Sequence, residues 1–478
     1  MAPEPMPRSV AHAWRPRELP PLLHPQLDAL IHRAPHTLLD WVARLGSPLN
    51  VMWPDRLRDN VQALRSAERR HGLPLALYYG AKVNKSQALV QAAVEAGIGI
   101  DVSSEPELRD ALRAGAKAED LCATGPAKTE AFLRQLLAGG SLVAVDSLDE
   151  LAQLQALARA MASPRPARVL LRCRPRPAAG SRFGMADDEL RHAMQRLAGA
   201  PQAQAGRVEL EGLHAHLPGY QHVHRAEAVG EMSAHADTAR RLGLSPRLID
   251  IGGGLPVRYV DADAGDAFLQ AQGPQHYRHG QVPAAFYPYG GRTDAGGWLD
   301  LLLESPCRDG QTVARCLRGG GLQLALEPGR CLADQAGFTV FRIARVKAMA
   351  GGTLVLFVEG SSFSACETWF GSEFLVDPIL ISVGTSRPEP RAGGPVRAWI
   401  AGHSCLDDDV LANRLIAFET PPRAGDLLVW ANTAGYQMDL LENEFHRHPM
   451  PPRVATRALA GGGFELWPDD DREHTTSR

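Results

Sequence analysis

Four residue patterns that could do chemistry each follow a short apolar run. Lys82 ends the run at residues 75–81, and a lysine amine is costly to bury there unless it has a partner or a chemical task. His216, the glycines at 252–254 and the sequence EPGR at 327–330 end three further runs. Each pattern alone also fits an ordinary role: a surface lysine, a hydrogen-bonded core histidine, a flexible turn and a local salt bridge. They form one site only if the fold brings the four run ends together.

The runs belong to a repeating strand and helix pattern. Strands are expected at residues 75–81, 98–102, 120–124, 142–146, 168–173, 208–216, 247–251 and 322–326, mostly with amphipathic segments between them. Eight such repeats indicate a (β/α)8 barrel rather than an open sheet. The active site of such a barrel lies at the C-terminal ends of its strands, where all four patterns fall. Glycine backbone at that edge can surround a phosphate without side-chain obstruction.

The pattern changes on both sides of the barrel. Residues 1–45 predict an N-terminal extension with a short helix over 36–45, and residues 54–330 predict the barrel domain. Residues 46–53 and 331–478 predict a mainly β domain, because β-like segments there are separated by Gly and Pro turns. Residues 258–320 are long for one barrel connection and predict an insertion over the mouth.

Composition limits the classes of partner. The 478 residues include 51 basic and 54 acidic side chains, a net charge of −3, and no block of like charge that would indicate nucleic-acid binding. The seven cysteines contain no CxxC pair, so neither a metal site nor a disulfide framework is expected, and a reducing cytoplasm fits best. Prolines and charges interrupt the N-terminus before a signal peptide could form, and no later segment is expected to span a membrane.

Taken together, the motifs resemble one enzyme family. YGAKVN, GLHAHLPG, IDIGGG and LEPGR, in this order, resemble the fold-type III pyridoxal-phosphate decarboxylases, the group of diaminopimelate, ornithine and arginine decarboxylases. PLNVMWPDRLRDNV, IDVSSEPEL, SRFGM, GHSCLDDDVLA and GDLLVWANTAGYQM extend the resemblance from about Leu49 to Met438. Alanine racemase shares the barrel but is less similar. The resemblance implies an alanine-racemase-like barrel, a C-terminal mainly β domain and pyridoxal 5'-phosphate as cofactor.

The resemblance also implies roles for individual residues. Lys82 matches the lysine that bonds to the cofactor aldehyde, with Lys85 as a rival three residues later. Glu327 matches the carboxylate that pairs with the pyridine nitrogen, and His216 the histidine that stacks on the ring. The residues matched to phosphate binding are Gly252, Gly253, Gly254, Gly329, Arg330 and, from the β domain, Tyr436.

A cysteine motif near the C-terminus implies a homodimer with shared active sites. Cys405 matches a cysteine that comes from the partner subunit and returns a proton after decarboxylation, and Asp409 matches a residue that contacts the substrate side chain. Leu406 stands where diaminopimelate decarboxylases carry a glutamate, so the pocket is expected to differ from theirs. Trp369, in the segment WFGSE, is expected to line a roomier pocket, although aromatic residues more often simply pack. That segment resembles the siderophore-associated branch, which acts on amino acids joined to a carboxylic acid such as citrate.

The leading functional prediction is therefore removal of the α-carboxylate from an amino acid or from such a conjugate. Two alternatives stay open. An amino-acid racemase would need a tyrosine opposite the lysine, and the cysteine motif argues against it. A catalytically silent regulatory binding protein of the same fold would tend to have lost Lys82, Glu327 and Cys405, all of which are present.

Overall fold

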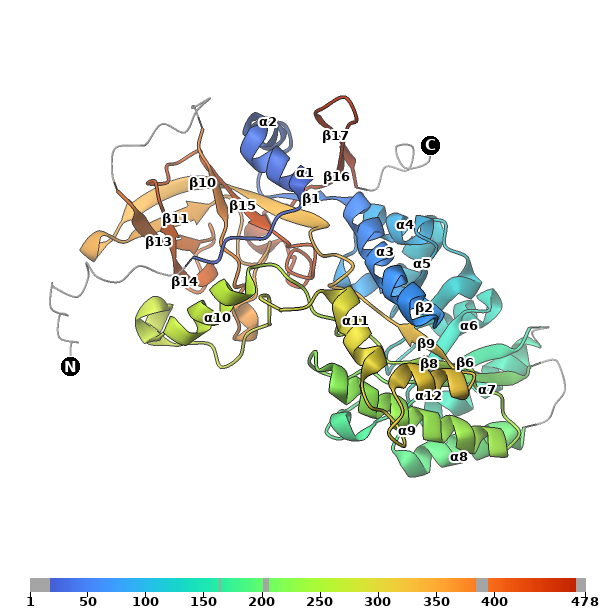
Figure 1. Cartoon of the computed structure of the whole chain (residues 1–478). Helices are drawn as coiled ribbons and strands as arrows, with labels where there is room; N and C mark the ends of the chain where they lie inside the picture. Colours follow the sequence, from blue (N-terminus) through green and yellow to red (C-terminus); the bar gives the residue numbers. More distant parts are fainter. Residues whose placement is uncertain (1–17, 163–164, 201–205, 384–393, 470–478) are drawn as a thin grey trace. The chain divides into compact units, whose positions relative to one another are not determined.

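The computed structural model describes residues 18–162, 165–200, 206–383 and 394–469, and these residues form two compact units (Figure 1). One unit contains residues 54–256 and 293–333, and the other contains residues 18–53, 257–292 and 334–469. These units differ from the predicted domains in two segments. Residues 257–292 were predicted to belong to the barrel domain, and residues 18–45 to a separate N-terminal extension. Among the described residues, no helix is both long and apolar enough to cross a bilayer.

The first unit is a closed barrel of eight parallel strands, as predicted. Its strands are β2 (Leu75–Gly80), β3 (Gly99–Val102), β4 (Leu121–Ala123), β5 (Leu142–Val145), β6 (Ala167–Arg172), β7 (Val208–His214), β8 (Leu248–Asp250) and β9 (Gln323–Leu326). The last strand, β9, pairs with both β8 and β2 and so closes the barrel. Each of the eight expected strands is present, which confirms the fold predicted from the sequence.

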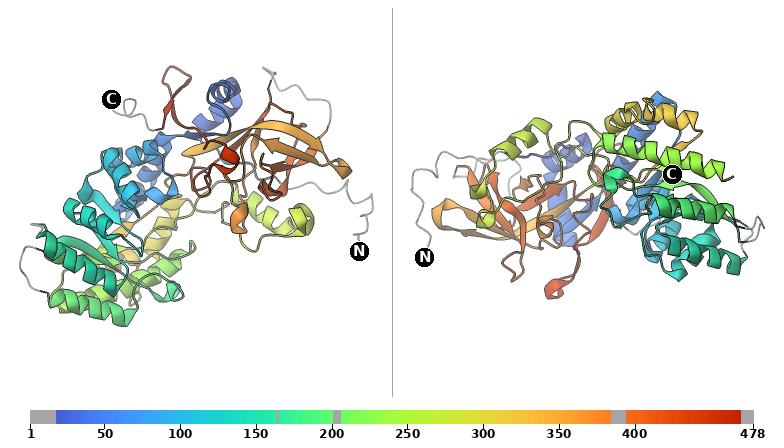
Figure 2. Two further views of the ribbon diagram at one scale, coloured as in Figure 1. Left: turned by 180° about the vertical axis from the view of Figure 1, so that it is seen from behind. Right: turned by 90° about the horizontal axis from the view of Figure 1, so that it is seen from below.

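Helices surround this barrel (Figure 2). They are α3 (Pro54–His71), α4 (Gln87–Glu95), α5 (Glu105–Arg113), α6 (Glu130–Gly139), α7 (Leu148–Met161), α8 (Asp187–Ala198), α9 (His222–Arg241), α11 (Ala295–Glu304) and α12 (Val313–Gly319). Five of them begin after a hydroxyl side chain that accepts a backbone N–H of the first turn: Ser86, Ser104, Thr129, Ser147 and Thr312. Such caps satisfy otherwise unpaired amides and fix where each helix begins after its strand.

Apolar side chains pack the interior of the barrel. The cluster contains Cys122, Leu142, Ala144, Leu170, Leu248 and Ala325, with Ala76 and Tyr78 packed against it. The barrel therefore has a filled core and no pore, and its polar chemistry is confined to the strand ends.

The second unit is built on a nine-stranded sheet. Seven strands follow the order β14-β13-β11-β10-β1-β16-β17, while β15 pairs with β10 and β12. The strands are β1 (Leu49–Met52), β10 (Gly337–Ala348), β11 (Leu354–Val358), β12 (Ile379–Ile381), β13 (Val396–Ala401), β14 (Val410–Phe418), β15 (Leu427–Ala431), β16 (Arg453–Ala458) and β17 (Phe464–Pro468). This confirms the predicted mainly β domain.

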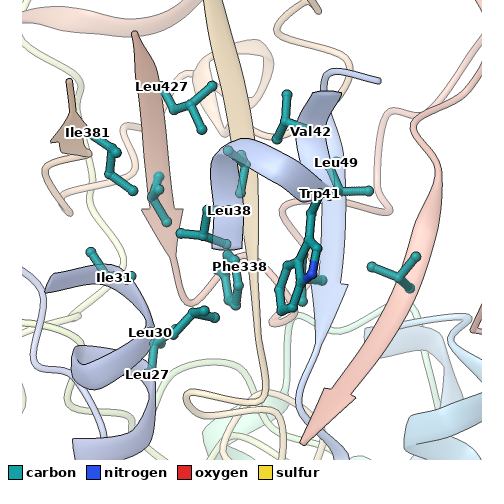
Figure 3. Close-up of a cluster of buried hydrophobic side chains, with 14 of the residues drawn as sticks. Leu27, Leu30, Ile31, Leu38, Trp41, Val42, Leu49, Phe338, Ile381 and Leu427 are labelled. Atoms are coloured by element: carbon teal, nitrogen blue, oxygen red, sulfur yellow. The ribbon is translucent and has the colours of Figure 1, made fainter. Parts of the chain in front are cut away.

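The N-terminal segment packs into the core of this sheet. Helices α1 (Pro25–Asp28) and α2 (Pro35–Leu45) supply apolar side chains to a buried cluster that β1, β10 and β15 complete (Figure 3). Trp41 of α2 is 3% exposed and belongs to the same cluster as Phe338 of β10. This burial is why the segment groups with the β unit.

The segment at 257–292, which includes α10 (Ala262–Ala271), is tied to the same unit by aromatic contacts. Tyr289 stacks on Tyr259 with ring centroids 5.1 Å apart and meets Phe374 edge-on at 5.1 Å. The Tyr289 hydroxyl also bonds to the buried carboxylate of Glu367. These contacts explain why the segment groups with the β unit.

Candidate active site at the barrel mouth

Lys82 lies just past the end of β2, in the short 3-10 turn Ala81–Val83. Its Nζ donates a hydrogen bond of 3.2 Å to Oδ2 of Asp101, whose side chain is fully buried, whereas the Lys82 side chain is 38% exposed. Thr124 Oγ1 donates to the other carboxylate oxygen at 2.7 Å. Burial raises the pKa of Asp101, and the positive charge of Lys82 opposes that rise. The amine is therefore oriented by a buried carboxyl group yet remains accessible.

Glu327 follows β9, the strand that pairs with β2. Leu77 of β2 is in register with Leu326, and the Gly80 N–H donates to the carbonyl of Pro328 at 3.3 Å. A side chain at Gly80 would lie 3.8 Å from both the Asp101 carboxylate and the Glu327 carbonyl. Barrel closure therefore places the acidic residue beside the strand that carries the lysine.

Two histidines from β7 and its end surround the Glu327 carboxylate. His214 Nε2 lies 3.0 Å from Oε1, and His216 Nδ1 lies 3.6 Å from Oε2. Burial lowers the pKa of His214, so its neutral ring can donate Nε2–H to the carboxylate. Burial alone would raise the pKa of Glu327, but His214, His216 and the charge of Lys82 hold it well below its ordinary value. Glu327 is thus a buried anion.

The glycines at 252–254 form a turn that has no room for side chains. Gly252 and Gly254 have φ values of 66° and 85°, a region that favours glycine. A Cβ at Gly252 would lie 2.4 Å from His216 Nδ1, and one at Gly254 would lie 2.2 Å from Arg225 Nη2. The turn thus exposes backbone without side chains beside the His216 ring, which is what a phosphate group attached to a stacked ring would need.

Arg225 and Asp250 support this turn and were not assigned by sequence reasoning. Arg225 is fully buried on α9, and its Nη2 donates to the carbonyls of Leu217 at 2.9 Å and Gly219 at 2.7 Å. Asp250 accepts the Gly252 N–H at 2.8 Å. Burial, and next the charge of Glu327, raise the pKa of Asp250 well above its ordinary value. Of these two buried carboxyl groups, Asp250 is therefore protonated and neutral, and Glu327 carries the negative charge.

The predicted barrel residues therefore lie together. Lys82, His216, Glu327 and residues 252–254 share one end of the barrel, and Gly329 and half-buried Arg330 directly follow Glu327 and Pro328. This set suits pyridoxal phosphate, because it offers an amine, a buried anion and a turn with no side chains. Lys85, the rival lysine, is also exposed, but Lys82 has the buried carboxylate partner.

Sequence reasoning missed Asp101 and His214 as well. The spacing in GLHAHLPG holds a signal for the second, since residues two apart in a strand share a face. His214 should therefore face inward whenever His216 does. Asp101 lies in the quoted segment IDVSSEPEL, where one carboxylate in an apolar strand is the only signal.

The remaining predicted residues belong to the β unit and are described within it. Asp409 is buried, and its carboxylate accepts Ser362 N–H and Oγ–H at 2.7 Å each and Ser404 N–H at 3.0 Å. Trp369 is 41% exposed. Tyr436 is half-buried and has a φ of 89°. Cys405 is exposed on the loop between β13 and β14.

Comparison with known proteins identifies the family. Residues 57–272 match the model of the pyridoxal binding domain of pyridoxal-dependent decarboxylases. The uncharacterized protein y4yA of Sinorhizobium fredii is 53% identical over 451 residues, which cover 94% of this chain and 96% of that protein. The L-glutamyl acyl-carrier-protein decarboxylase of Niallia circulans is 24% identical over 443 residues, covering 88% of this chain and 91% of that protein.

The fold agrees with a solved structure of the same family. Diaminopimelate decarboxylase from M. jannaschii, in complex with L-lysine, superposes with a TM-score of 0.67 at 17% identity. The match covers 90% of this chain and 91% of that one. The amine, the buried anion and the glycine turn at one barrel end agree with these matches: the chain belongs to the fold-type III pyridoxal-phosphate-dependent amino-acid decarboxylases, which are carboxy-lyases.

Proposed function

We propose that this enzyme removes the α-carboxylate of a diaminopimelate-like amino acid or of an amino acid joined to a carboxylic acid, such as a citryl siderophore precursor. The observation that supports this assignment of the site is the pairing of β2 with β9, because Lys82, with its partner Asp101, and buried Glu327 follow these two adjacent strands. Bound pyridoxal phosphate supplies an aldehyde that captures amines and a ring that takes up the electron pair freed as carbon dioxide leaves.

Residues at the barrel mouth would orient that cofactor and set the protonation of its ring nitrogen. Lys82 would hold the cofactor through its amine until the amino group of the substrate takes its place. Glu327, kept anionic with the help of His214, would accept a hydrogen bond from the pyridine nitrogen and so keep that nitrogen protonated. His216 would pack against the ring, and residues 252–254, Gly329 and Arg330 would hold the phosphate.

The residues in the loops of the β unit support the proposal for the distal end of the substrate. Leu406 follows Cys405 and offers no charge for a distal ammonium group. Trp369 is exposed and could line a wide pocket, with Asp409 ordering the adjoining loops. A matched family member acts on glutamyl groups carried by a protein, which supports a conjugated substrate.

A homodimer with shared active sites is part of the proposal. Large apolar side chains near the cysteine motif are exposed, at 41% for Trp369, 56% for Phe370, 39% for Leu406 and 39% for Phe445. Exposed apolar groups of this kind mark protein interfaces. We infer that the second subunit covers them and that Cys405 acts in the partner's site. None of the seven cysteines, all of which lie in the described part of the chain, forms a disulfide, and this supports the expected cytoplasmic location.

A substrate panel tests the function. Purified holoenzyme is incubated with diaminopimelate, lysine, ornithine, arginine, glutamate and citryl-diamine conjugates that keep a free α-amino acid end, and carbon dioxide is measured. We expect release from a substrate with a distal carboxyl group or a conjugate. Exchange of the α-proton without carbon dioxide would favour a racemase, and neither reaction with any compound would favour a binding protein.

A further inference from the structure

The exposed thiol of Cys405 has an imidazole partner. His446 Nε2 lies 3.2 Å from Cys405 Sγ, within hydrogen-bond distance for sulfur, and His446 is also exposed. The two residues lie far apart in the sequence but within the same unit. A thiol beside an imidazole can pass its proton to the ring and recover it.

Stacked rings fix the orientation of His446 on one side. Its ring stacks on Phe445 with centroids 4.2 Å apart, and Phe445 meets Phe363 edge-on at 6.0 Å. Phe363 in turn stacks on Trp369 at 5.2 Å. The imidazole therefore belongs to a row of aromatic rings, which limits its rotation although it is exposed.

Two further imidazoles lie on the other side. His448 is 6.4 Å from His446 between ring centroids and stacks on His403 at 3.8 Å. His403 is anchored, because the Gly360 N–H donates to its Nδ1 at 3.1 Å. Burial, and next the charge of His448, hold the pKa of His403 below its ordinary value. Positive charge on the neighbouring imidazoles therefore disfavours a proton on His403.

The acidic groups of the cysteine loop are already paired. Asp407 and Asp408 each lie 3.3 Å from Arg278 Nη2. Asp409 is satisfied by Ser362 and Ser404. The Cys405 thiol thus has an imidazole as its close titratable partner.

The backbone at His446 is held in an unusual conformation. His446 has a φ of 57° and Arg447 a φ of 62°, both in the left-handed region. Residues other than glycine seldom adopt this conformation, because their Cβ atom is crowded in it. Strain of this kind gathers at functional sites, and here it accompanies the turn of the His446 ring toward Cys405.

We propose that His446 is a positioning residue that stores and replaces the proton of Cys405. This inference rests on the proposed function, in which Cys405 Sγ–H protonates the α-carbon after carbon dioxide has left. The electron pair left on that carbon forms the new C–H bond, and the S–H pair stays on sulfur. The Nε2–H of protonated His446 then returns a proton to the sulfur, and solvent reprotonates the imidazole.

Alkylation of the thiol tests the pairing without relying on turnover. Holoenzyme is treated with iodoacetamide at about pH 7 and about pH 10, and modification of the Cys405 peptide is followed by mass spectrometry, because only the thiolate reacts. We expect His446→Asn to slow the reaction several-fold at pH 7 and little at pH 10. His448→Asn, which removes a neighbouring ring that does not contact the thiol, should not slow it. Equal rates in both variants at pH 7 would overturn the pairing.

A double-mutant cycle tests the role in the reaction. We expect His446→Asn to lower kcat, and to have little further effect once Cys405 is changed to Ser, since both residues then act on one proton. Fully additive losses would overturn that role. If no compound of the substrate panel releases carbon dioxide, the proposed function fails, while the alkylation rates still decide the Cys405–His446 pairing.

Discussion

The barrel mouth and the Cys405 loop hold reactive groups by different means. At the mouth, Lys82 and Glu327 follow the ends of adjacent strands, and buried partners hydrogen-bond to both side chains. In the β unit, Cys405 and His446 are exposed on loops, and ring stacking with left-handed backbone orients them. In a strand, backbone pairing alone fixes the position of a residue. In a loop, the contacts of the side chains have to fix it. We therefore expect changes at the mouth to affect chemistry and changes in the loop to affect geometry first.

Removal of the Lys82 amine should have the largest effect. We expect Lys82→Ala to lower kcat by about three orders of magnitude or more and to abolish the visible absorbance of the covalently held cofactor. Lys85→Ala is the control and should keep both. Peptide mapping after borohydride reduction identifies the bonded lysine, and a label on Lys85 would refute the assignment of the site.

Neutralising Glu327 tests whether the buried charge matters. Glu327→Gln keeps the size and a hydrogen-bonding group, and we expect kcat/KM to fall about 10²-fold or more. The low pKa of Glu327 should also stabilise the fold above the unfolded value of about 4.3. The difference in Tm between native enzyme and variant should therefore shrink as the pH falls below about 4. A constant difference from pH 7 to pH 3 would contradict a depressed pKa.

The β unit contains a carboxyl group with the opposite shift. Burial raises the pKa of Glu373 to about 8. The folded protein then holds this proton more tightly than the unfolded chain, so the contribution of Glu373 to stability falls as the pH rises from about 4.3 to about 8. We expect Glu373→Gln to raise Tm at pH 8 by about 2–4 °C and by less at pH 5. Equal shifts at both pH values would show that ionisation is not the cause.

The smallest effect is expected from Asp250→Asn. The raised pKa of Asp250 indicates a neutral side chain, and asparagine keeps an oxygen that can accept the Gly252 N–H. Thermal unfolding at pH 7 should show no loss of Tm for this variant. Asp250→Ala should instead cost about 1–3 kcal/mol, since a buried N–H loses its acceptor. Equal losses in both variants would mean that the charge of Asp250 is needed.

The same contrast explains what could be predicted from the sequence. Short apolar runs, separated by amphipathic segments, predicted the eight strands. Lys82, His216 and Glu327 were then found at the ends of three of these runs. Arg225 was not predictable in this way, because a charged residue on a helix is normally solvated, whereas here Arg225 is buried and donates to carbonyls of the loop between β7 and α9. Burial of α2 was likewise missed, although Leu38, Trp41 and Val42 have helical spacing, since the proline-rich start favoured an extension.

Because β9 closes the barrel, cofactor binding depends on completion of the barrel. During synthesis the lysine emerges early, but the acidic partner arrives only with the last strand, after nearly the whole barrel has been made. A truncated or nascent chain that ends before residue 323 would carry the reactive amine with neither β9 nor Glu327 beside it. Stable binding of pyridoxal phosphate should therefore be limited to molecules in which β2 and β9 have paired.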